Sequence, residues 1–245
     1  MVMRPQPLPP IRGLEPLSLT AWEGRVAAVI SLQGCNFDCP GCPVQHLISV
    51  KPDLGTIPAE SVLETIYMRR RWLDAVVVRG GEPTLHEGLP DLLRLLLEFD
   101  LRVRLSTNGT NPAMLARLIG AGEVSSISMT VRAPLDPVYS VAAGTKVKLA
   151  AVYESVELLL ATPGEHEFRI PWLPEVVEAD QMEAVIRMLS GARRVVLMPS
   201  TDGSPGVRDL RRVGRSAGHF VESCIVAGRP NEDFGSAARS RKVVS

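Results

Sequence analysis

Three of the four cysteines in the chain lie within eight positions, as Cys35, Cys39 and Cys42 of the stretch SLQGCNFDCPGCPVQH. A disulfide uses only two thiols, so a group of three points to another kind of chemistry. Closely spaced thiolates are soft ligands that suit zinc or an iron–sulfur cluster. A structural zinc site needs a fourth ligand, and His46, four residues after Cys42, is a candidate for it. A Cys3His zinc site and an iron–sulfur site are both open at this point.

Two further stretches carry groups that could bind a ligand. In Gly80-Gly81-Glu82-Pro83, paired glycines let a ligand approach the backbone, and the carboxylate can accept from an ammonium group. An ordinary turn is the alternative, because glycine and proline are common in turns. The stretch STNGT, residues 106–110, offers hydroxyl and amide groups beside a glycine. All three stretches lie at the carboxyl ends of successive expected strands, and these ends form the active face of parallel α/β folds.

The elements that must position these residues follow from an alternation of β-branched runs with segments that have helical spacing. This alternation predicts an α/β fold with right-handed crossovers and a mostly parallel sheet. Six units are fewer than the eight of a complete barrel, so we expect a partial (β/α)6 TIM-like barrel, with an open doubly wound sheet as the alternative. The expected strands are 25–32, 75–80, 101–109, 125–133, 167–173 and 193–199. The expected helices are 58–71, 89–99, 112–121, 145–160 and 179–190.

The same pattern divides the chain into an N-terminal lead over 1–24, the barrel over 25–200 and a remaining segment over 201–245. Within that segment, residues 206–245 hold eight Lys or Arg and four Asp or Glu. We expect a solvated tail there, and a docking segment for a macromolecule is the alternative.

The composition is that of a folded protein, with 45% hydrophobic and 22% charged residues. The 27 basic and 27 acidic residues balance, so the chain has no overall charge that would attract nucleic acid or a membrane. No apolar run approaches the ~20 residues that span a bilayer, and the start, MVMRPQPLPPIRG, lacks the apolar stretch of a signal peptide. We therefore expect a cytoplasmic protein with no membrane or nucleic-acid partner, in which thiols stay reduced.

Taken together, these motifs resemble the radical S-adenosylmethionine (radical SAM) superfamily, and more narrowly the activating enzymes of glycyl-radical enzymes such as the anaerobic ribonucleotide reductase. The resemblance covers roughly residues 12–200 and includes the cysteine motif, GGEPTL, STNGT and SMTVRAPLDPVYS. It implies that Cys35, Cys39 and Cys42 ligate three irons of a [4Fe–4S] cluster and leave the fourth iron to S-adenosylmethionine. One electron would then split the cofactor into methionine and a 5′-deoxyadenosyl radical, which abstracts a hydrogen atom.

The resemblance also implies roles for other residues. Gly80, Gly81 and Glu82 would bind the methionyl ammonium group of the cofactor. Ser106 and Asn108 would meet its carboxylate or ribose. Arg132, where relatives usually have lysine, would pair with the carboxylate, and Arg169 is a further candidate there, with a surface salt bridge as the alternative. His46 would then be no ligand, and Cys224 an ordinary buried or tail cysteine.

Several positions depart from the family pattern. Gly41 replaces the usual aromatic residue before the third cysteine, and Ser106 and Thr130 stand where relatives often have acids. Because two hydroxyls bind a hard cation only weakly, we expect cofactor cleavage to need little added cation.

The resemblance implies a glycyl-radical enzyme as protein substrate and a reduced flavodoxin or ferredoxin as electron donor. A radical enzyme acting on a small molecule, peptide or RNA base is the second hypothesis. A non-enzymatic zinc or cluster protein is the third.

Overall fold

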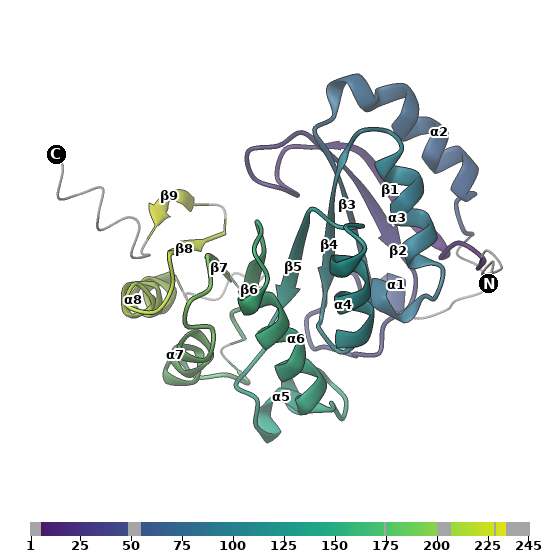
Figure 1. Cartoon of the computed structure of the whole chain (residues 1–245). Coiled ribbons are helices and arrows are strands. Elements are labelled where there is room, and N and C mark those ends of the chain that lie inside the picture. Colours follow the sequence, from purple (N-terminus) through teal and green to yellow (C-terminus); the bar gives the residue numbers. More distant parts are fainter. Residues whose placement is uncertain (1–5, 49–54, 174, 200–206, 228, 234–245) are drawn as a thin grey trace, which may run out of the picture. The chain divides into compact units, whose positions relative to one another are not determined.

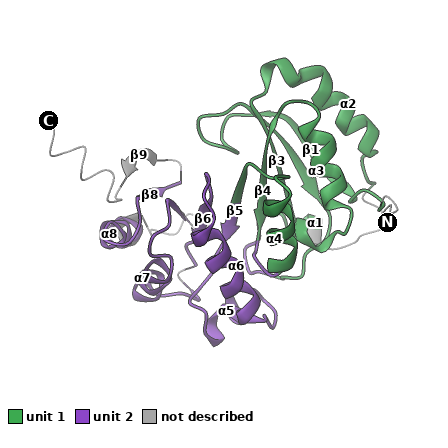
Figure 2. Cartoon of the chain, in the orientation of Figure 1, with its two compact units in different colours: residues 1–38, 44–107, 111–127 green, residues 39–43, 108–110, 128–245 purple. Residues whose placement is uncertain are grey.

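A computed structural model describes residues 6–48, 55–173, 175–199, 207–227 and 229–233. The chain forms two compact units, shown in green and purple in Figure 2. Unit 1 comprises residues 1–38, 44–107 and 111–127, and unit 2 comprises residues 39–43, 108–110 and 128–245. The cysteine stretch and the STNGT stretch therefore each contribute residues to both units.

The sheet of unit 1 begins with an antiparallel pair and continues with parallel strands (Figure 1). Strand β1 (Ile11–Ser18) runs antiparallel to β2 (Ala27–Leu32). Strands β2, β3 (Ala75–Gly80) and β4 (Arg102–Thr107) then pair in parallel in that order. Leu32 is in register with Gly80, and each residue ends its strand. The cysteine stretch and the glycine turn thus start at the same level of the sheet.

The helices of unit 1 follow the strands in chain order. They are α1 (Gln45–Ile48), α2 (Ala59–Arg69), α3 (Leu89–Leu97) and α4 (Pro112–Gly120), with short 3-10 turns η1 (Arg70–Trp72) and η2 (Pro83–Leu85).

Apolar runs account for these elements. β2 and β3 are buried over most of their length, as expected for parallel strands that are covered on both faces. In α3 the buried leucines recur at helical spacing, at positions 89, 92, 93 and 96. Helix α4 begins with Pro112 at its first position, and the Asn111 side chain accepts a hydrogen bond from the Met114 N–H at 3.2 Å.

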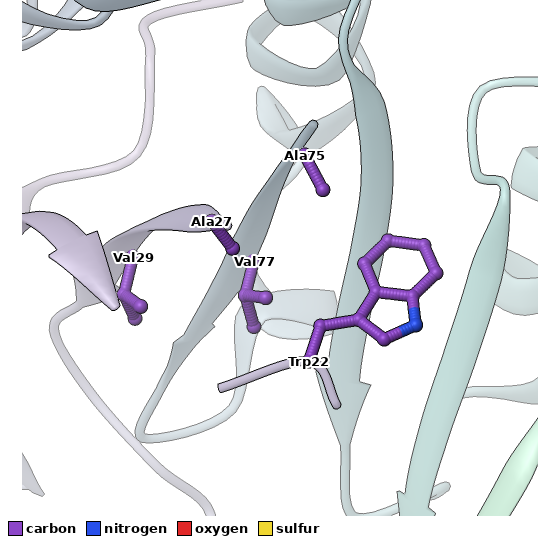
Figure 3. Packing of buried hydrophobic residues seen from close by; sticks show 5 residues of the cluster. All are labelled: Trp22, Ala27, Val29, Ala75 and Val77. Atoms are coloured by element: carbon purple, nitrogen blue, oxygen red, sulfur yellow. The ribbon is translucent and has the colours of Figure 1, made fainter. Parts of the chain in front are cut away.

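Trp22, in the connection between β1 and β2, packs on the beginnings of β2 and β3 (Figure 3). Its side chain is 3% exposed and lies in a cluster with Ala27, Val29, Ala75 and Val77. The two alanines are small, which leaves room for the indole. The guanidinium groups of Arg25, Arg102 and Arg104 lie 5.1, 5.5 and 4.2 Å from the ring centroid. The residues expected to form an N-terminal lead therefore contribute β1 and a core side chain to unit 1.

Unit 2 repeats the helix–strand alternation. It contains most of β5 (Ser126–Thr130), then α5 (Pro137–Ala142), α6 (Leu149–Ala161), β6 (Glu167–Pro171), α7 (Ala179–Met188), β7 (Arg194–Met198), α8 (Val207–Ala217), β8 (Ser223–Val226) and β9 (Arg229–Asp233). Strands β5 to β8 pair in parallel in chain order, and β9 pairs antiparallel with β8.

The six expected strands correspond to β2 through β7, whereas β1, β8 and β9 were not expected. Helices α1, α5 and α8 were not expected either. Helix α8 and strand β8 lie beyond residue 200, where a tail was expected, and β8 pairs with β7. Cys224 lies on β8 and is fully buried. The last twelve residues of the expected tail lie outside the described residues. None of the helices in the described part of the chain is long and apolar enough to cross a bilayer.

Candidate functional site

The first part of the cysteine stretch belongs to unit 1, and backbone contacts hold it in place directly after the end of β2. Gly34 has a φ of +85°, and its N–H donates to the Leu47 carbonyl oxygen at 2.9 Å. Cys35 follows, and its Sγ accepts a hydrogen bond from the N–H of the buried Phe37 at 3.4 Å. Hydrogen bonds of this kind stabilise a thiolate and tune iron–sulfur clusters.

The other two cysteines lie in unit 2, in a tight turn. The Cys42 N–H donates to the Cys39 carbonyl oxygen at 3.2 Å, and Gly41 between them has a φ of +65°. Proline followed by a residue with positive φ is the pattern of a type II turn, in which glycine is strongly favoured at that place. The positive φ of this turn therefore accounts for a glycine at position 41.

The donor chemistry of the three cysteines suits an iron–sulfur cluster. None of the four cysteines is in a disulfide; Cys39 is buried, and Cys35 and Cys42 are partly exposed. Within the described residues, no group of three or more His, Cys, Asp or Glu side chains is arranged to hold a metal ion. His46, the candidate fourth ligand of a zinc site, is exposed. The fit of the three thiols to a cluster thus rests on their number, spacing and thiol state.

The Gly80–Glu82 turn packs backbone to backbone against the start of the cysteine stretch. Gly80 has a φ of +144°, and a Cβ atom there would lie 2.1 Å from the Leu32 carbonyl oxygen. A Cβ on Gly81 would lie 1.8 Å from the carbonyl oxygen of Gly34. The Glu82 N–H donates to that same oxygen at 2.7 Å. Both glycines are therefore required by close approach.

A second contact holds the same segment. A ring nitrogen of His86, Nε2, lies 2.7 Å from the Gln33 carbonyl oxygen. The residues immediately before Cys35 are thus fixed by the segment that follows β3.

Glu82 is fully buried, and its carboxylate lies in a network of hydroxyl groups. The Oε1 atom accepts from the Thr84 N–H at 3.1 Å, from the Thr84 hydroxyl at 2.5 Å and from the Thr107 hydroxyl at 2.8 Å. Sequence reasoning did not single out Thr84 or Thr107, although both lie inside the motifs GGEPTL and STNGT. Ser106 and Thr107 are consecutive in β4, so their side chains lie on opposite faces of the sheet. This alternation is the sequence signal that distinguishes the two residues.

The STNGT stretch is a hydrogen-bonded turn at the end of β4. Ser106, on β4 in unit 1, is partly exposed. In unit 2 the Asn108 side-chain oxygen accepts from the Thr110 N–H at 3.0 Å and from the Thr110 hydroxyl at 2.7 Å. Gly109 has a φ of +76° and packs on Met129, since a Cβ there would lie 2.1 Å from the methionine Cε. The side-chain oxygen of Asn108 thus stabilises the turn in which Asn108 lies.

Arg132 and Arg169 lie in unit 2, Arg132 two residues beyond the end of β5 and Arg169 in the middle of β6. Thr130 is in register with Arg169, and the Val131 N–H donates to the Arg169 carbonyl oxygen at 2.9 Å. The Nε atom of Arg132 is buried and has no hydrogen-bond partner within the described residues. A buried guanidinium nitrogen of this kind fits an acceptor supplied by a ligand.

The Arg169 side chain is held by a carboxylate that sequence reasoning missed. Its Nε donates to Oε1 of Glu167 at 2.8 Å, and Glu167 is 3% exposed. Glu167 also accepts from the Ser128 hydroxyl at 2.8 Å and pairs with Arg194 at 3.5 Å. The ion pair of Arg169 is therefore made to a buried group and not to a surface acid. An isolated Glu at the start of a strand gives no sequence signal of this role.

Comparison with known proteins places this arrangement in a family context. A family model described as the radical SAM superfamily matches residues 29–189, well over half of the chain. A candidate glycyl-radical enzyme activating enzyme of Methanocaldococcus jannaschii is 22% identical over 232 residues, which cover 88% of this chain and 95% of that protein. A 7-carboxy-7-deazaguanine synthase of Rhodospirillum rubrum is 38% identical over 91 residues, which cover 36% of each protein.

Solved structures show the same fold. Streptococcus suis SuiB bound to the precursor peptide SuiA aligns with a TM-score of 0.64 and 13% identity, over 82% of this chain and 48% of that chain. SuiB bound to S-adenosylmethionine aligns with a TM-score of 0.58 and 14% identity, over 76% of this chain and 47% of that chain. The expected fold class, α/β with a mostly parallel sheet of the partial-barrel type, is confirmed.

Proposed function

Because the chain belongs to the radical SAM superfamily, whose enzymes use a [4Fe–4S] cluster and S-adenosylmethionine, we propose that it cleaves this cofactor reductively to install a glycyl radical on a partner enzyme. In this proposal Cys35, Cys39 and Cys42 ligate the cluster. The observation that carries it is the packing of the Gly80–Glu82 turn on Gly34, directly before Cys35. That packing joins the backbone directly before Cys35 to the proposed cofactor turn within unit 1.

When bound, the cluster supplies the electron that splits the cofactor to methionine and a 5′-deoxyadenosyl radical. The chain's own residues bind and orient the methionine end. Gly80, Gly81 and Glu82 are assigned to the side of the ammonium group, where the absence of side chains on the glycines lets the cofactor approach the backbone. The buried Nε of Arg132 supports its assignment to the carboxylate, because a guanidinium group suits the planar geometry of that acceptor.

Three further residues are assigned around the cofactor. Ser106 and Asn108 belong to the carboxylate or ribose, and the turn that Asn108 forms with Thr110 fixes its position. Arg169 is assigned to the same region, where Glu167 orients its guanidinium group.

A protein substrate is supported by the relative from Methanocaldococcus jannaschii, which matches this chain over nearly its full length. In this proposal a reduced flavodoxin or ferredoxin supplies the electron and the enzyme works in the cytoplasm. The second candidate function is radical chemistry on a small molecule, peptide or RNA base. It is supported by the matching segment of 7-carboxy-7-deazaguanine synthase and by the shared fold of SuiB, which was solved with a precursor peptide.

Electron paramagnetic resonance separates the two candidates. The reconstituted, reduced protein is incubated anaerobically with S-adenosylmethionine and with glycyl-radical enzymes from the same organism. We expect a doublet signal of a glycyl radical on one partner, and its loss when the reacting glycine is replaced by alanine. Cofactor cleavage without a radical on any of these partners, accompanied by a modified small molecule, peptide or RNA, would reject glycyl activation in favour of the second candidate.

A further inference from the structure

We propose that Thr107 and Thr84 are positioning residues that fix the Glu82 carboxylate, and that Glu82 supports cofactor binding by anchoring the backbone of its turn. This inference rests on the proposed function, which assigns the Gly80–Glu82 turn to the cofactor. It gives Glu82 the role of a buried anchor of the turn, and it adds two threonines to the residues on which the site depends.

The contacts of Glu82 account for this role. Its side chain is fully buried, and three donors converge on its Oε1 atom at 2.5 to 3.1 Å. One carboxylate oxygen has two lone pairs, so these three donors saturate Oε1 and hold the carboxylate in one orientation. Two of the donors come from Thr84, within the same turn, and the third comes from Thr107, the last residue of β4. The carboxylate thus ties the segment after β3 to the end of β4.

A second hydrogen bond makes the same connection. The Asn111 side-chain amide donates to the Thr84 carbonyl oxygen at 2.8 Å. Asn111 also caps α4, which follows β4. The segment around Thr84 is therefore held to Thr107, within the STNGT stretch, and to Asn111, directly after it.

The backbone of Glu82 continues this connection to the cluster segment. Its N–H donates to the Gly34 carbonyl oxygen at 2.7 Å, and Gly81 has no room for a side chain against the same oxygen. A shift of the Glu82 side chain therefore moves the backbone that contacts the residue before Cys35. Loss of the Thr107 hydroxyl should therefore weaken the binding of the cofactor. We expect this effect even though Thr107 is only 5% exposed and its side chain is uncharged.

The test compares Thr107→Val, which keeps the shape and removes the hydroxyl, with Thr107→Ser, which keeps the hydroxyl. Binding of S-adenosylmethionine to the reconstituted protein is measured by calorimetry, together with the change that the cofactor causes in the resonance spectrum of the reduced cluster. Thr107→Val removes a hydrogen bond to a buried charged group, so we expect it to bind S-adenosylmethionine roughly ten-fold or more weakly. Thr107→Ser keeps the hydroxyl and should retain most of the affinity. Thr162→Val is the matched control, because its hydroxyl donates to the Leu158 carbonyl oxygen at 2.6 Å in unit 2 and has no role here. It should bind the cofactor as the unmodified protein does.

Glu82 variants separate anchoring from direct ligation. An anchor needs an acceptor, so Glu82→Gln should retain much more affinity than Glu82→Ala. The double variant Thr107→Val with Glu82→Ala should bind the cofactor no more weakly than Glu82→Ala alone, because both changes break the same hydrogen bond. A direct ligand requires the negative charge, so equal losses in Glu82→Gln and Glu82→Ala, with Thr107→Val like the control, would overturn the inference.

Two further outcomes are distinguishable. If the unmodified protein assembles no cluster and binds no cofactor, the proposed function fails and this inference fails with it. If it does both and Thr107→Val matches Thr162→Val, the positioning role alone is wrong. Thermal unfolding is recorded for each variant, and should Thr107→Val not fold, Thr84→Val removes a different donor from the same oxygen and carries the same expectation.

Discussion

Replacing Gly81 by alanine should damage the site, because it forces two closely packed backbone segments apart. A Cβ atom at this position would lie 1.8 Å from the Gly34 carbonyl oxygen and 2.4 Å from its carbonyl carbon. Ordinary contacts of a Cβ begin near 3.4 Å, so the two backbone segments must separate by more than an ångström. That separation also breaks the 2.7 Å hydrogen bond from the Glu82 N–H to Gly34.

The magnitude follows from these two losses. Overpacking a rigid region costs about 1–3 kcal/mol. A lost backbone hydrogen bond adds roughly 0.5–1.5 kcal/mol. We therefore expect Gly81→Ala to lower the free energy of unfolding by about 2–4 kcal/mol and, in the folded fraction, to displace the segment that carries Cys35. Iron content after anaerobic reconstitution should fall with it.

Gly120→Ala provides the control. Gly120 ends helix α4, and a Cβ atom there would meet nothing within 4 Å. Since alanine is a better helix former than glycine, this variant should be unchanged or more stable by up to about 1 kcal/mol. Urea unfolding monitored by circular dichroism gives both values, and iron analysis gives the cluster content. Gly81→Ala with the stability and iron content of Gly120→Ala would refute the packing of the Gly80–Glu82 turn on Gly34.

Three other expectations concern single groups of the site. Arg132→Ala should weaken S-adenosylmethionine binding severely and Arg132→Lys only in part, because lysine keeps the charge but lacks the planar fork. Calorimetric titration measures both affinities, and equal affinities of the two variants would contradict the assignment of Arg132 to the cofactor carboxylate. Cys224→Ala should leave iron content and cofactor cleavage nearly unchanged, since Cys224 is buried on β8; a fall in iron content of the folded protein would contradict this. Cofactor cleavage should change little when sodium, potassium or magnesium is added after dialysis, because Ser106 and Thr130 are neutral; a strong cation requirement would refute that account.

The central strands could be predicted because parallel strands covered on both faces have continuous apolar sequences. AVISL in β2 and AVVV in β3 are such runs. The strands that were missed lack this signal. β1 contains Gly13 and Pro16 and lies at the edge of the sheet beside β2, and β8 has four residues in a part of the chain rich in basic residues. Their place in the sheet is decided by the strands they pair with.

The proposed site could be predicted as motifs but not as a network. Spacing identified Cys35 and Glu82, but it contained no information on which hydroxyls contact Glu82. That depends on the register between β3 and β4, which brings Thr107 to the turn. Glu167 was missed for the same reason, because its partners come from neighbouring strands. Conversely, the glycine at position 41 has a local explanation, namely the positive φ of its turn.

The most direct test of the account is the formation of 5′-deoxyadenosine and methionine from S-adenosylmethionine by anaerobically reconstituted protein reduced with dithionite. The unmodified protein should hold about four irons per chain and form the two products in equal amounts. Cys42→Ala, which removes one of the three proposed ligands, should form neither. A cluster-loaded protein that forms no 5′-deoxyadenosine, or a Cys42→Ala variant with full turnover, would contradict the assignment of Cys35, Cys39 and Cys42 to a cluster that cleaves this cofactor.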